Sequence, residues 1–502
     1  MMVNMALSDN PVLLKHVRSR LRLQHMWPAV AGVVLICMSI IWAAIQSTSP
    51  DRMEAGFDCL VALQALILFL MGTGQAASSM ARAQESGMLD FHRITPQPPL
   101  ATALGFVLGA PIREYVLFLC TLPFALPFVL SGHPGPVGFA EVVVAMLASA
   151  FLYHCFGALI GATASRSAPV VVGIVVALYV TSQMSTAIAS LTILPTMAAL
   201  SSHHIGDMFH SFFYGAPVAA PTLALIHEAP LSALLLVALT RKMRRDRMRP
   251  YSKPVAIVFQ VILAALVVGD LWPNSGGSLP WSVSMGMLQT VSCLLAILTI
   301  SGSILAAEVA PDAGELASGV RRALKQGSNR VPAWSDAATN LATTFWIAGI
   351  TLAAGAALST APFPRPDSPE RIAEVSILAV FVILYFGSAR QFFDARYGKR
   401  GRPLFGLLLF CTWILPLLIA LIASTADLPL QGQQGMLCLS PLSLFVVVAD
   451  HSVHQTAIAL GVGLSGLLSV VFTVLAIRAS RALARSAGQR ADCGEEHHTT
   501  VR

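Results

Sequence analysis

Long apolar stretches alternate with short polar stretches along this 502-residue chain. A helix needs about 20 apolar residues to cross the hydrocarbon of a bilayer, where its backbone groups must be hydrogen-bonded internally. Twelve stretches come close to this requirement and are predicted to be membrane-spanning helices. The first six are Trp27–Ile45, Phe57–Ala77, Tyr115–Leu130, Gly138–Ala162, Pro169–Leu191 and Ala216–Thr240. The second six are Val255–Trp272, Val283–Ala306, Leu341–Leu358, Ile372–Gly387, Leu404–Ile422 and Thr456–Ile477.

The twelve stretches form two sets of six in the same order. A basic segment, Arg241–Lys253, separates the sets, and in each set a long polar loop follows the second stretch. Both sets begin on the same side of the membrane, so the repeat is parallel. We therefore predict an all-α polytopic protein with two fused six-helix halves, residues 1–250 and 251–480, followed by a disordered cytoplasmic tail at 481–502.

Positive charges identify the cytoplasmic side. Of the 32 Lys and Arg residues, all but Arg52, Arg365 and Arg371 fall in the set of loops that includes both termini. Anionic lipids and the membrane potential retain Lys and Arg on the cytoplasmic side. This pattern predicts that both termini are cytoplasmic, and it is typical of a protein in a bacterial-type cytoplasmic (inner) membrane.

The composition excludes a soluble protein. Hydrophobic residues make up 55% and charged residues 11% of the chain, whereas soluble domains are about 25% charged. The net charge of +7 comes from the cytoplasmic loops. It therefore indicates contact with anionic lipids and not with nucleic acid. Before the first span, residues Pro11–Met26 place Leu13, Leu14 and Val17 on one helical face and basic residues on the other, which predicts a helix lying flat at the inner interface.

The two long cytoplasmic loops share the string acid-x-Gly-x-Leu. In the first loop this string is Glu85, Gly87 and Leu89, with Phe91 and Pro96 following. In the second loop it is Asp312, Gly314 and Leu316, and the next proline, Pro332, comes later. Each loop becomes amphipathic after the string, and each is far longer than a connector requires. The pattern predicts a helix that docks on a partner, although a plain amphipathic surface helix remains the alternative.

With these loops the chain resembles the membrane subunits of exporter-class (type 2) ABC transporters. In that family a cytosolic segment after the second span carries an acid, a Gly, a Leu and then a Pro, and it forms a coupling helix that sits in a groove of the ATPase subunit. The resemblance implies that Glu85, Gly87, Leu89 and Pro96 form one such joint and that Asp312, Gly314 and Leu316 form a less closely matching second one.

The same resemblance implies the partners. A pair of separate ABC ATPase subunits would bind ATP and magnesium, and the chain itself would bind no cofactor and would export a small or lipophilic substrate across the lipid bilayer. Many family members carry one six-span half per chain, whereas here two halves are fused. The chain contains no Gly-x-x-x-x-Gly-Lys-Ser/Thr string, so it has no P-loop of its own for ATP.

Ionisable residues inside the predicted spans are candidates for a substrate path. His227 and Glu228 fall near the middle of the sixth stretch, and His154 in the fourth stretch is a possible partner for them. The alternative is that Pro230 marks a re-entrant turn that keeps the pair in water. Outside the spans, His203, Asp207 and His210 share one helical face and are a weak candidate for a metal site. Their spacing matches no catalytic zinc motif, so we expect no metal there.

Two other functions fit parts of the sequence. A secondary active transporter could also have six plus six helices, but its loops after the second and eighth spans would be short and basic. A membrane-embedded enzyme could use the histidine cluster before the sixth stretch, but no set of residues converges at a catalytic spacing. We therefore expect a transport subunit and not an enzyme.

Overall fold

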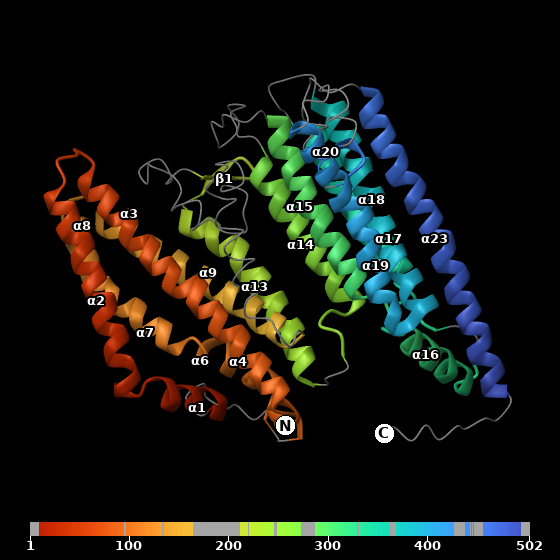
Figure 1. Ribbon diagram of the computed structural model, residues 1–502, viewed down its shortest axis with the longest axis horizontal. Helices are drawn as coiled ribbons and strands as arrows, with labels where there is room; N and C mark the ends of the chain where they lie inside the picture. Colours follow the sequence, from red (N-terminus) through yellow and green to blue (C-terminus); the bar gives the residue numbers. More distant parts are fainter. Residues whose placement is uncertain are drawn as a thin grey trace. The chain divides into compact units, whose positions relative to one another are not determined.

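The computed structural model describes residues 10–94, 97–132, 135–163, 211–218, 220–244, 248–272, 287–328, 331–361, 368–425, 437–441, 443, 445 and 455–492. The chain divides into two compact units, Met1–Pro250 and Tyr251–Arg502. The division falls within the basic segment that separates the two sets of apolar stretches in the sequence. Figure 1 shows the helices of both units.

The described part of unit 1 is helical apart from one short hairpin of strands. Its helices are α1 (Pro11–Arg20), α2 (Leu23–Gln46), α3 (Arg52–Ala65), α4 (Thr73–Glu85), α5 (Met88–Ile94), α6 (Pro99–Gly109), α7 (Ile112–Thr121), α8 (Leu126–Leu130), α9 (Gly135–Gly161) and α13 (Ala220–Arg244). A π-helix, η2 (Leu66–Gly72), joins α3 to α4, and a 3-10 turn, η3 (Leu122–Ala125), joins α7 to α8. Strands β1 (Ser211–Phe213) and β2 (Ala216–Val218) pair antiparallel, with Ser211 opposite Val218.

Small residues let the helices of unit 1 approach one another closely. A side chain at Gly157 on α9 would meet the Thr73 carbonyl oxygen of α4 at 2.7 Å, and Gly161 faces Ala77 in the same way. Gly105 on α6 would meet Val12 of α1 at 2.7 Å, and Gly109 faces His16. Gly105 and Gly109, like Gly157 and Gly161, are four residues apart and lie on one face of their helix, and this spacing usually serves close helix contacts.

Unit 2 is built from longer helices. They are α14 (Lys253–Leu271), α15 (Met287–Glu308), α16 (Ala313–Lys325), α17 (Leu341–Thr360), α18 (Ser368–Tyr397), α19 (Gly401–Leu409), α20 (Leu415–Thr425) and α23 (Gln455–Asp492). The 3-10 turn η5 (Gly398–Arg400) joins α18 to α19, and the π-helix η6 (Phe410–Ile414) joins α19 to α20. The chain bends by 59° between α15 and α16. Helix α18 lies at the centre, in contact with α15, α17, α19 and α23.

Helices α18 and α19 form an antiparallel hairpin. The rings of Phe386 and Phe405 lie 5.0 Å apart, and the Tyr385 hydroxyl is 2.8 Å from the Thr412 hydroxyl, so residues on either side of the turn face each other. Gly398 in the turn has a φ of +56°, which favours glycine. The apolar stretch Glu370–Ile422 therefore holds two helices, at the tenth and eleventh stretches of the sequence.

The same order of helix contacts occurs in both units. In unit 1, α9 packs against α4 and α13, and α2 packs against α3 and α7. In unit 2, α18 packs against α15 and α23, and α14 packs against α15 and α17. The helices of each unit can be numbered one to six by the predicted stretches to which they correspond. In both units, helix two then contacts helix four, helix four contacts helix six, and helix one contacts helices two and three. The internal repeat read from the order of apolar stretches thus has a counterpart in the packing of each unit.

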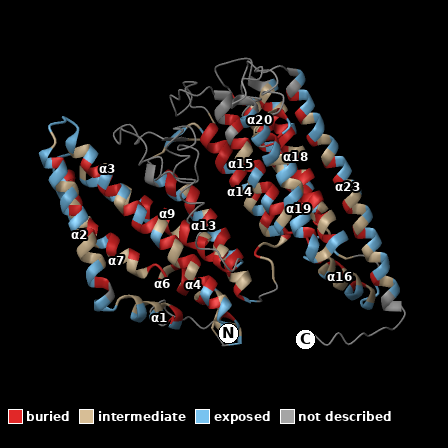
Figure 2. Cartoon of the chain, in the orientation of Figure 1, coloured by how far each residue is buried: buried red, intermediate tan, exposed pale blue. Residues whose placement is uncertain are grey.

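The apolar helices are those of a multi-pass membrane protein. Within the described ranges, nine helical stretches are long and apolar enough to cross a bilayer, or ten if the bent pair α15 and α16 counts as one span. The predicted fifth span, Pro169–Leu191, lies outside the described residues. Figure 2 shows exposed positions along the outer faces of α2 and α23. On α2 these positions include Trp27, Leu35 and Trp42, which suits contact with lipid. The number twelve and the cytoplasmic position of the termini remain predictions.

The first part of the C-terminal tail differs from the prediction, while residues 493–502 lie outside the described residues. Residues 481–502 were expected to be disordered, but α23 continues as a helix to Asp492. The segment after Ile477 is rich in alanine, the best helix former. Ala487 is buried, and α23 packs against α16. Packing against a second helix, combined with high helix propensity, explains why this polar segment is ordered.

Candidate functional site

In unit 1 the loop after the second apolar helix turns sharply at Gly87. Helix α4 ends at Glu85, and the Gly87 amide donates to the Gln84 carbonyl at 3.1 Å. Gly87 has a φ of +71°, where a residue with a Cβ is strained. Its carbonyl accepts from the Asp90 amide at 3.1 Å and so begins α5. The glycine of the predicted string is therefore the hinge residue between the two helices.

Helix α5 presents some motif residues outward and keeps others inside. Leu89 is 3% exposed, whereas Phe91 is 60% and Ile94 is 82% exposed. The sequence predicted that Leu89 and Phe91 together would fill a partner's groove, but Leu89 packs within unit 1. Leu89 is the buried residue of α5, and Phe91, two positions later, lies about 200° around the helix from it and therefore faces outward.

The carboxylate at Glu85 is exposed at the last residue of α4. No hydrogen bond or ion pair engages it among the described residues. A negative charge at the carboxyl end of a helix opposes the helix dipole, so this side chain does nothing for the fold that would explain its position. The sequence predicted Pro96 as the end of this motif, but Pro96 lies outside the described residues.

Arg93 ties α5 to the last apolar helix of unit 1. Its guanidinium donates to the carbonyls of Met243 at 3.3 Å and Lys242 at 3.4 Å, which end α13. It also forms an ion pair with Asp90, three residues earlier on α5. The Arg93 side chain is 13% exposed. A cation at carbonyls of a helix end is favourable because the helix dipole is negative there.

In unit 2 the equivalent loop helix α16 is built differently. Asp312 accepts a hydrogen bond from the Glu315 amide at 2.8 Å, and Glu315 accepts from the Asp312 amide at 3.2 Å. This reciprocal pair is a capping box, and it satisfies amides that the first turn leaves unpaired. The acidic residue predicted to meet a partner thus begins the helix.

Of the remaining motif residues of α16, Leu316 faces inward and Gly314 is exposed. Leu316 and Ala323 are each 6% exposed. A side chain at Gly319 would meet the Ala337 side chain at 2.6 Å, so α16 packs tightly on the segment before α17. Gly314 has ordinary helical backbone, with the nearest atom, Asp312 Oδ1, at 3.3 Å from the position of an added Cβ. The outward face of α16 carries Arg321 and Arg322, which are exposed.

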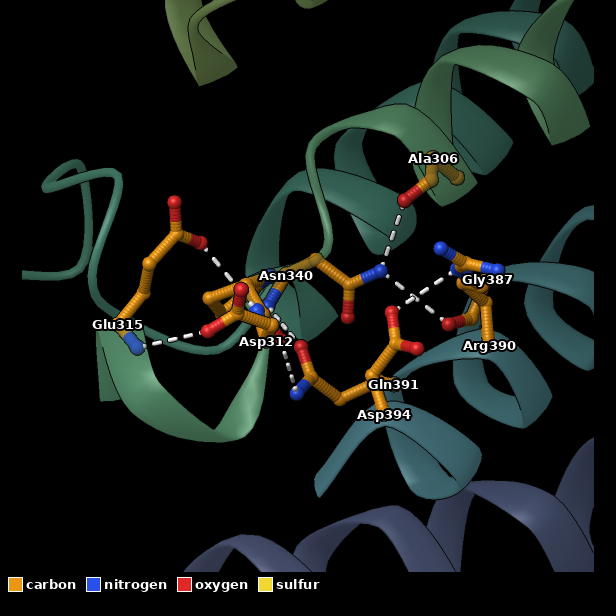
Figure 3. Close-up of polar contacts among 9 residues, drawn as sticks. Ala306, Asp312, Glu315, Asn340, Gly387, Arg390, Gln391 and Asp394 are labelled. Carbon is orange, nitrogen blue, oxygen red and sulfur yellow. Dashed lines mark hydrogen bonds and ion pairs between the residues drawn. The ribbon is translucent and has the colours of Figure 1, made fainter. Parts of the chain in front are cut away.

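Two buried amides hold the base of α16, as Figure 3 shows. The Asn340 side chain donates to the carbonyls of Ala306 at 2.8 Å and Gly387 at 3.1 Å. The Gln391 side chain accepts a hydrogen bond from the backbone N–H of Asn340 at 3.1 Å and donates one to the Pro311 carbonyl at 3.5 Å. Both residues are fully buried. This amide clamp, Asn340 and Gln391, therefore joins the ends of α15 and α17 to α18 and to the residue before Asp312.

Sequence reasoning missed the amide clamp. Each amide lies at or just beyond the end of an apolar stretch, where polar residues are expected at a membrane surface. Their positions alone therefore do not distinguish them from solvated side chains. The only signal in the sequence is that Asn340 directly precedes one apolar stretch and Gln391 follows the next one.

Glu228 lies inside unit 1 and not at a wet turn. His227 and Glu228 are 4% and 1% exposed, and α13 continues through Pro230. The alternative of a water-filled turn at Pro230 is therefore wrong. The Ser149 hydroxyl of α9 donates to Glu228 Oε1, while Glu228 Oε2 has no hydrogen-bond partner within the described part of the chain. The hydroxyl of Tyr153, one turn along α9 from Ser149, is also buried without a described partner.

His154 is not the partner of Glu228. Its Nδ1 lies 2.9 Å from the Tyr115 hydroxyl, and its Nε2 lies 3.0 Å from the Leu68 carbonyl. Leu68 belongs to the π-helix η2, whose wider turn releases carbonyls from the normal helical pattern. Gly72 leaves room for the imidazole ring beside it. His154 is thus engaged by two other elements, and the predicted pair of His154 with Glu228 does not form.

The predicted metal candidates His203, Asp207 and His210 lie outside the described residues. Within the described residues, no group of three His, Cys, Asp or Glu side chains is arranged to hold a metal. No protein-family model, curated protein or solved structure matches the chain.

Proposed function

We propose that this chain is the membrane-spanning permease subunit of an ATP-driven exporter of the type 2 ABC class. A pair of separate ATPase subunits, which bind ATP and magnesium, would dock on the cytoplasmic loops that contain α5 and α16. The chain would reside in a bacterial-type inner membrane and move a small or lipophilic substrate across it.

The observation that carries this proposal is the attachment of the two loop helices. Each unit places a short helix straight after its second long apolar helix, and each fixes that helix by buried polar contacts. Arg93 joins α5 to the end of α13. The amide clamp joins the residue before Asp312 to α15, α17 and α18. Such attachments let displacement of a loop helix move the spans as rigid bodies.

The exposed groups of the first loop supply a docking surface. Phe91 and Ile94 are apolar side chains in the open, and the Glu85 carboxylate is nearby at the end of α4. Exposed apolar side chains beside an unengaged charge are typical of a protein interface. An ATPase groove lined by apolar side chains with a basic residue at its edge would complement this surface.

Within the proposed permease, Glu228 is our candidate for the polar contact with substrate. A buried ionisable residue in a membrane span is costly to retain without a role. Ser149 holds one carboxylate oxygen, while the other oxygen and the Tyr153 hydroxyl have no described partner. A substrate with a hydrogen-bonding head and an apolar body suits this surrounding.

The test is capture of the tagged full chain from its native membranes in mild detergent, followed by assay of bound ATPase activity. The test variants are Glu85→Arg combined with Phe91→Asp in the first loop, and Arg321→Glu on the exposed face of α16. Asp312 is left intact because its substitution would break the capping box. Asp51→Arg is the matched control, since Asp51 is exposed and its side chain makes no capping bond.

We expect ATPase to accompany the wild type and the Asp51→Arg control, and to be lost by at least tenfold in the Glu85→Arg/Phe91→Asp variant. Normal expression of the wild type with no ATPase bound would overturn the proposal. It would favour the secondary transporter, or an enzyme that uses His203 and His210. Equal ATPase in all variants would show that α5 and α16 are not the joint.

A further inference from the structure

Four basic side chains converge where α1 meets α4 and α7. Lys15 and Arg20 belong to α1, Arg82 to α4 and Arg113 to the start of α7. Burial lowers the pKa of Arg20, Glu114 partly restores it, and Arg82 and Arg113 lower it further. The hydrogen bonds agree with this grouping: Arg20 donates to Gln75 and Ser79 of α4, and Arg82 donates to the Ser78 carbonyl on the same helix. Helix α7, which begins beside Arg113, contacts α1. These four residues are called the basic cluster below.

The pKa of His16, one turn before Arg20 on α1, is also affected by the basic cluster. Burial lowers the pKa of His16 to about 4, and Arg20, Lys15 and Arg82 contribute to the shift in that order. The imidazole is therefore neutral at physiological pH and adds no charge of its own. It packs edge-on against Phe106 of α6, with ring centroids 5.5 Å apart.

Helix α1, which carries Lys15 and Arg20 of this cluster, is held in place by contacts with α6. Asn10 caps the helix through the amides of Val12 at 3.0 Å and Leu13 at 3.3 Å, and its amide donates to the Ala101 carbonyl at 2.5 Å. Val12 is buried against Gly105. Figure 1 shows α1 lying crosswise to α2 and α4 at one end of unit 1. The basic side chains are thus held at fixed positions at the ends of apolar helices.

The charges of the basic cluster are not balanced by the described residues. Arg20 donates to neutral oxygens, Gln75 Oε1 at 2.6 Å and Ser79 Oγ at 2.9 Å. Arg113 Nε is buried without a hydrogen-bond partner in the described ranges. Glu114 is the one carboxylate that acts on Arg20, and its two oxygens also accept no hydrogen bond from the described residues. Among the described residues, Arg20 and Arg113 thus share the single carboxylate of Glu114.

We propose that the basic cluster binds the phosphate headgroup of an anionic phospholipid. Guanidinium groups bind phosphate oxygens in pairs, and clustered Lys and Arg at the ends of spans attract anionic lipids. Leu14 lies beside Lys15 and is 38% exposed, so α1 offers an apolar side chain for an acyl chain next to the cations. A soluble phosphate would use the cations alone, and this neighbouring apolar position favours the lipid.

The site adjoins the first loop helix. Lys15 Nζ lies 3.0 Å from the Met88 sulfur at the start of α5, and His92 of α5 shares the Phe106 ring with His16. A headgroup held by Lys15 and Arg113 would therefore stabilise α1, α5 and α7 together. This inference does not depend on the proposed transport function.

The test is native mass spectrometry of the full purified chain in mild detergent with equimolar phosphatidylglycerol and phosphatidylcholine. We expect the wild type to retain phosphatidylglycerol about tenfold more than phosphatidylcholine. Each basic residue contributes about 1 kcal/mol, so Arg113→Gln should weaken retention about fivefold. Arg113→Lys should restore most of it. Arg52→Gln is the matched control, because Arg52 is an exposed arginine outside the cluster.

Three results would overturn the assignment. The first is equal retention of the two lipids by the wild type. The second is the same loss in the Arg52→Gln control as in Arg113→Gln. The third is displacement of phosphatidylglycerol by millimolar inorganic phosphate, which would assign the cluster to a soluble phosphate compound. Circular dichroism of Arg113→Gln separates a folding defect from lost binding, and Arg82→Gln provides an independent substitution in the same cluster if Arg113→Gln does not fold.

Discussion

Helices α5 and α16 follow the same acid-x-Gly-x-Leu string but use its residues in different ways. At α5 the acid is exposed at the end of the preceding helix α4, the glycine bends the chain between the two helices, and Arg93 of α5 holds the short helix against α13. In α16 the acid caps the helix, the glycine is an ordinary helical residue, and the amide clamp fixes the base. The comparison shows that one string can produce a short hinged helix or a long capped helix, depending on where the preceding helix ends.

The amide clamp fixes α16 and has no counterpart among the described contacts of α5. Its removal should therefore have the largest effect on stability. Asn340→Ala would remove the side-chain donor that the carbonyls of Ala306 and Gly387 share, and it would leave a gap among buried polar groups. We expect a loss of about 2 to 4 kcal/mol in the free energy of unfolding, measured by denaturant titration in detergent. Ser359→Ala, at a half-buried position in the last turn of α17 whose hydroxyl hydrogen bond is exposed, should change stability by less than about 0.5 kcal/mol. A similar small change for Asn340→Ala would mean that the clamp does not hold the base of α16.

The two motif glycines provide a matched pair. Gly87→Ala should destabilise the protein by about 1 to 2 kcal/mol, because an alanine at a φ of +71° is strained although the space around it is open. Gly314→Ala places alanine in helical backbone and should be neutral or slightly stabilising. Denaturant titration of both variants checks the difference. Equal effects at the two positions would contradict the distinction between a hinge and a helical glycine.

Substitution of the two motif acids, Asp312 and Glu85, should change the free energy of unfolding by different but smaller amounts. Asp312→Ala removes the capping box and should cost about 1 kcal/mol, while Asp312→Ser should retain most of the stability because serine also caps helices. Glu85→Ala should cost nothing measurable, since no described contact depends on that carboxylate. Hydrogen exchange of the first turn of α16 and of the last turn of α4 reports each change locally. Faster exchange at α4 in Glu85→Ala would show a structural role that we do not assign.

The smallest expected difference between the two regions is in how their local stability depends on pH. His16, beside α5, has a pKa of about 4 in the folded chain, below its ordinary value of 6.5. The unfolded state therefore binds more protons between these values, and the stabilisation from neutral His16 is complete above pH 6.5 and lost as the pH falls toward 4.

The α16 sequence contains no histidine. Between pH 7 and pH 5 we expect hydrogen exchange, corrected for intrinsic rates, to rise in α1 and to stay constant in α16. His16→Gln should abolish the rise in α1. An unchanged rise in that variant would assign the pH sensitivity to another group.

Hydropathy predicted much of the fold, because lipid requires long apolar helices and their positions are visible as uninterrupted runs. The N-terminal amphipathic helix, the two loop helices and the division near Pro250 all have local signals. The string Asp312-x-x-Glu315 before an amphipathic run is itself a capping-box signal, so the start of α16 could have been inferred from it.

The site was less predictable because its contacts are long-range. Periodicity indicates that His154 faces inward, but it cannot show that Tyr115 and the Leu68 carbonyl, and not Glu228, are its neighbours. The π-helix that exposes the Leu68 carbonyl has no sequence signature. The contacts of Arg93 with the end of α13 join residues about 150 positions apart, and such pairing depends on how the helices pack.

Helix α23 has 38 residues, which corresponds to about 57 Å of helix, against about 30 Å of hydrocarbon in a bilayer. At the tilts of up to about 40° that membrane helices adopt, roughly 18 Å or more of it must therefore project beyond the hydrocarbon. The C-terminal part is the one that packs on α16, because Gly488 of α23 lies beside Leu324. The projecting part is thus a lever arm: a sideways push on α16 acts far from the bilayer centre and exerts a torque on the membrane-embedded part of the same helix.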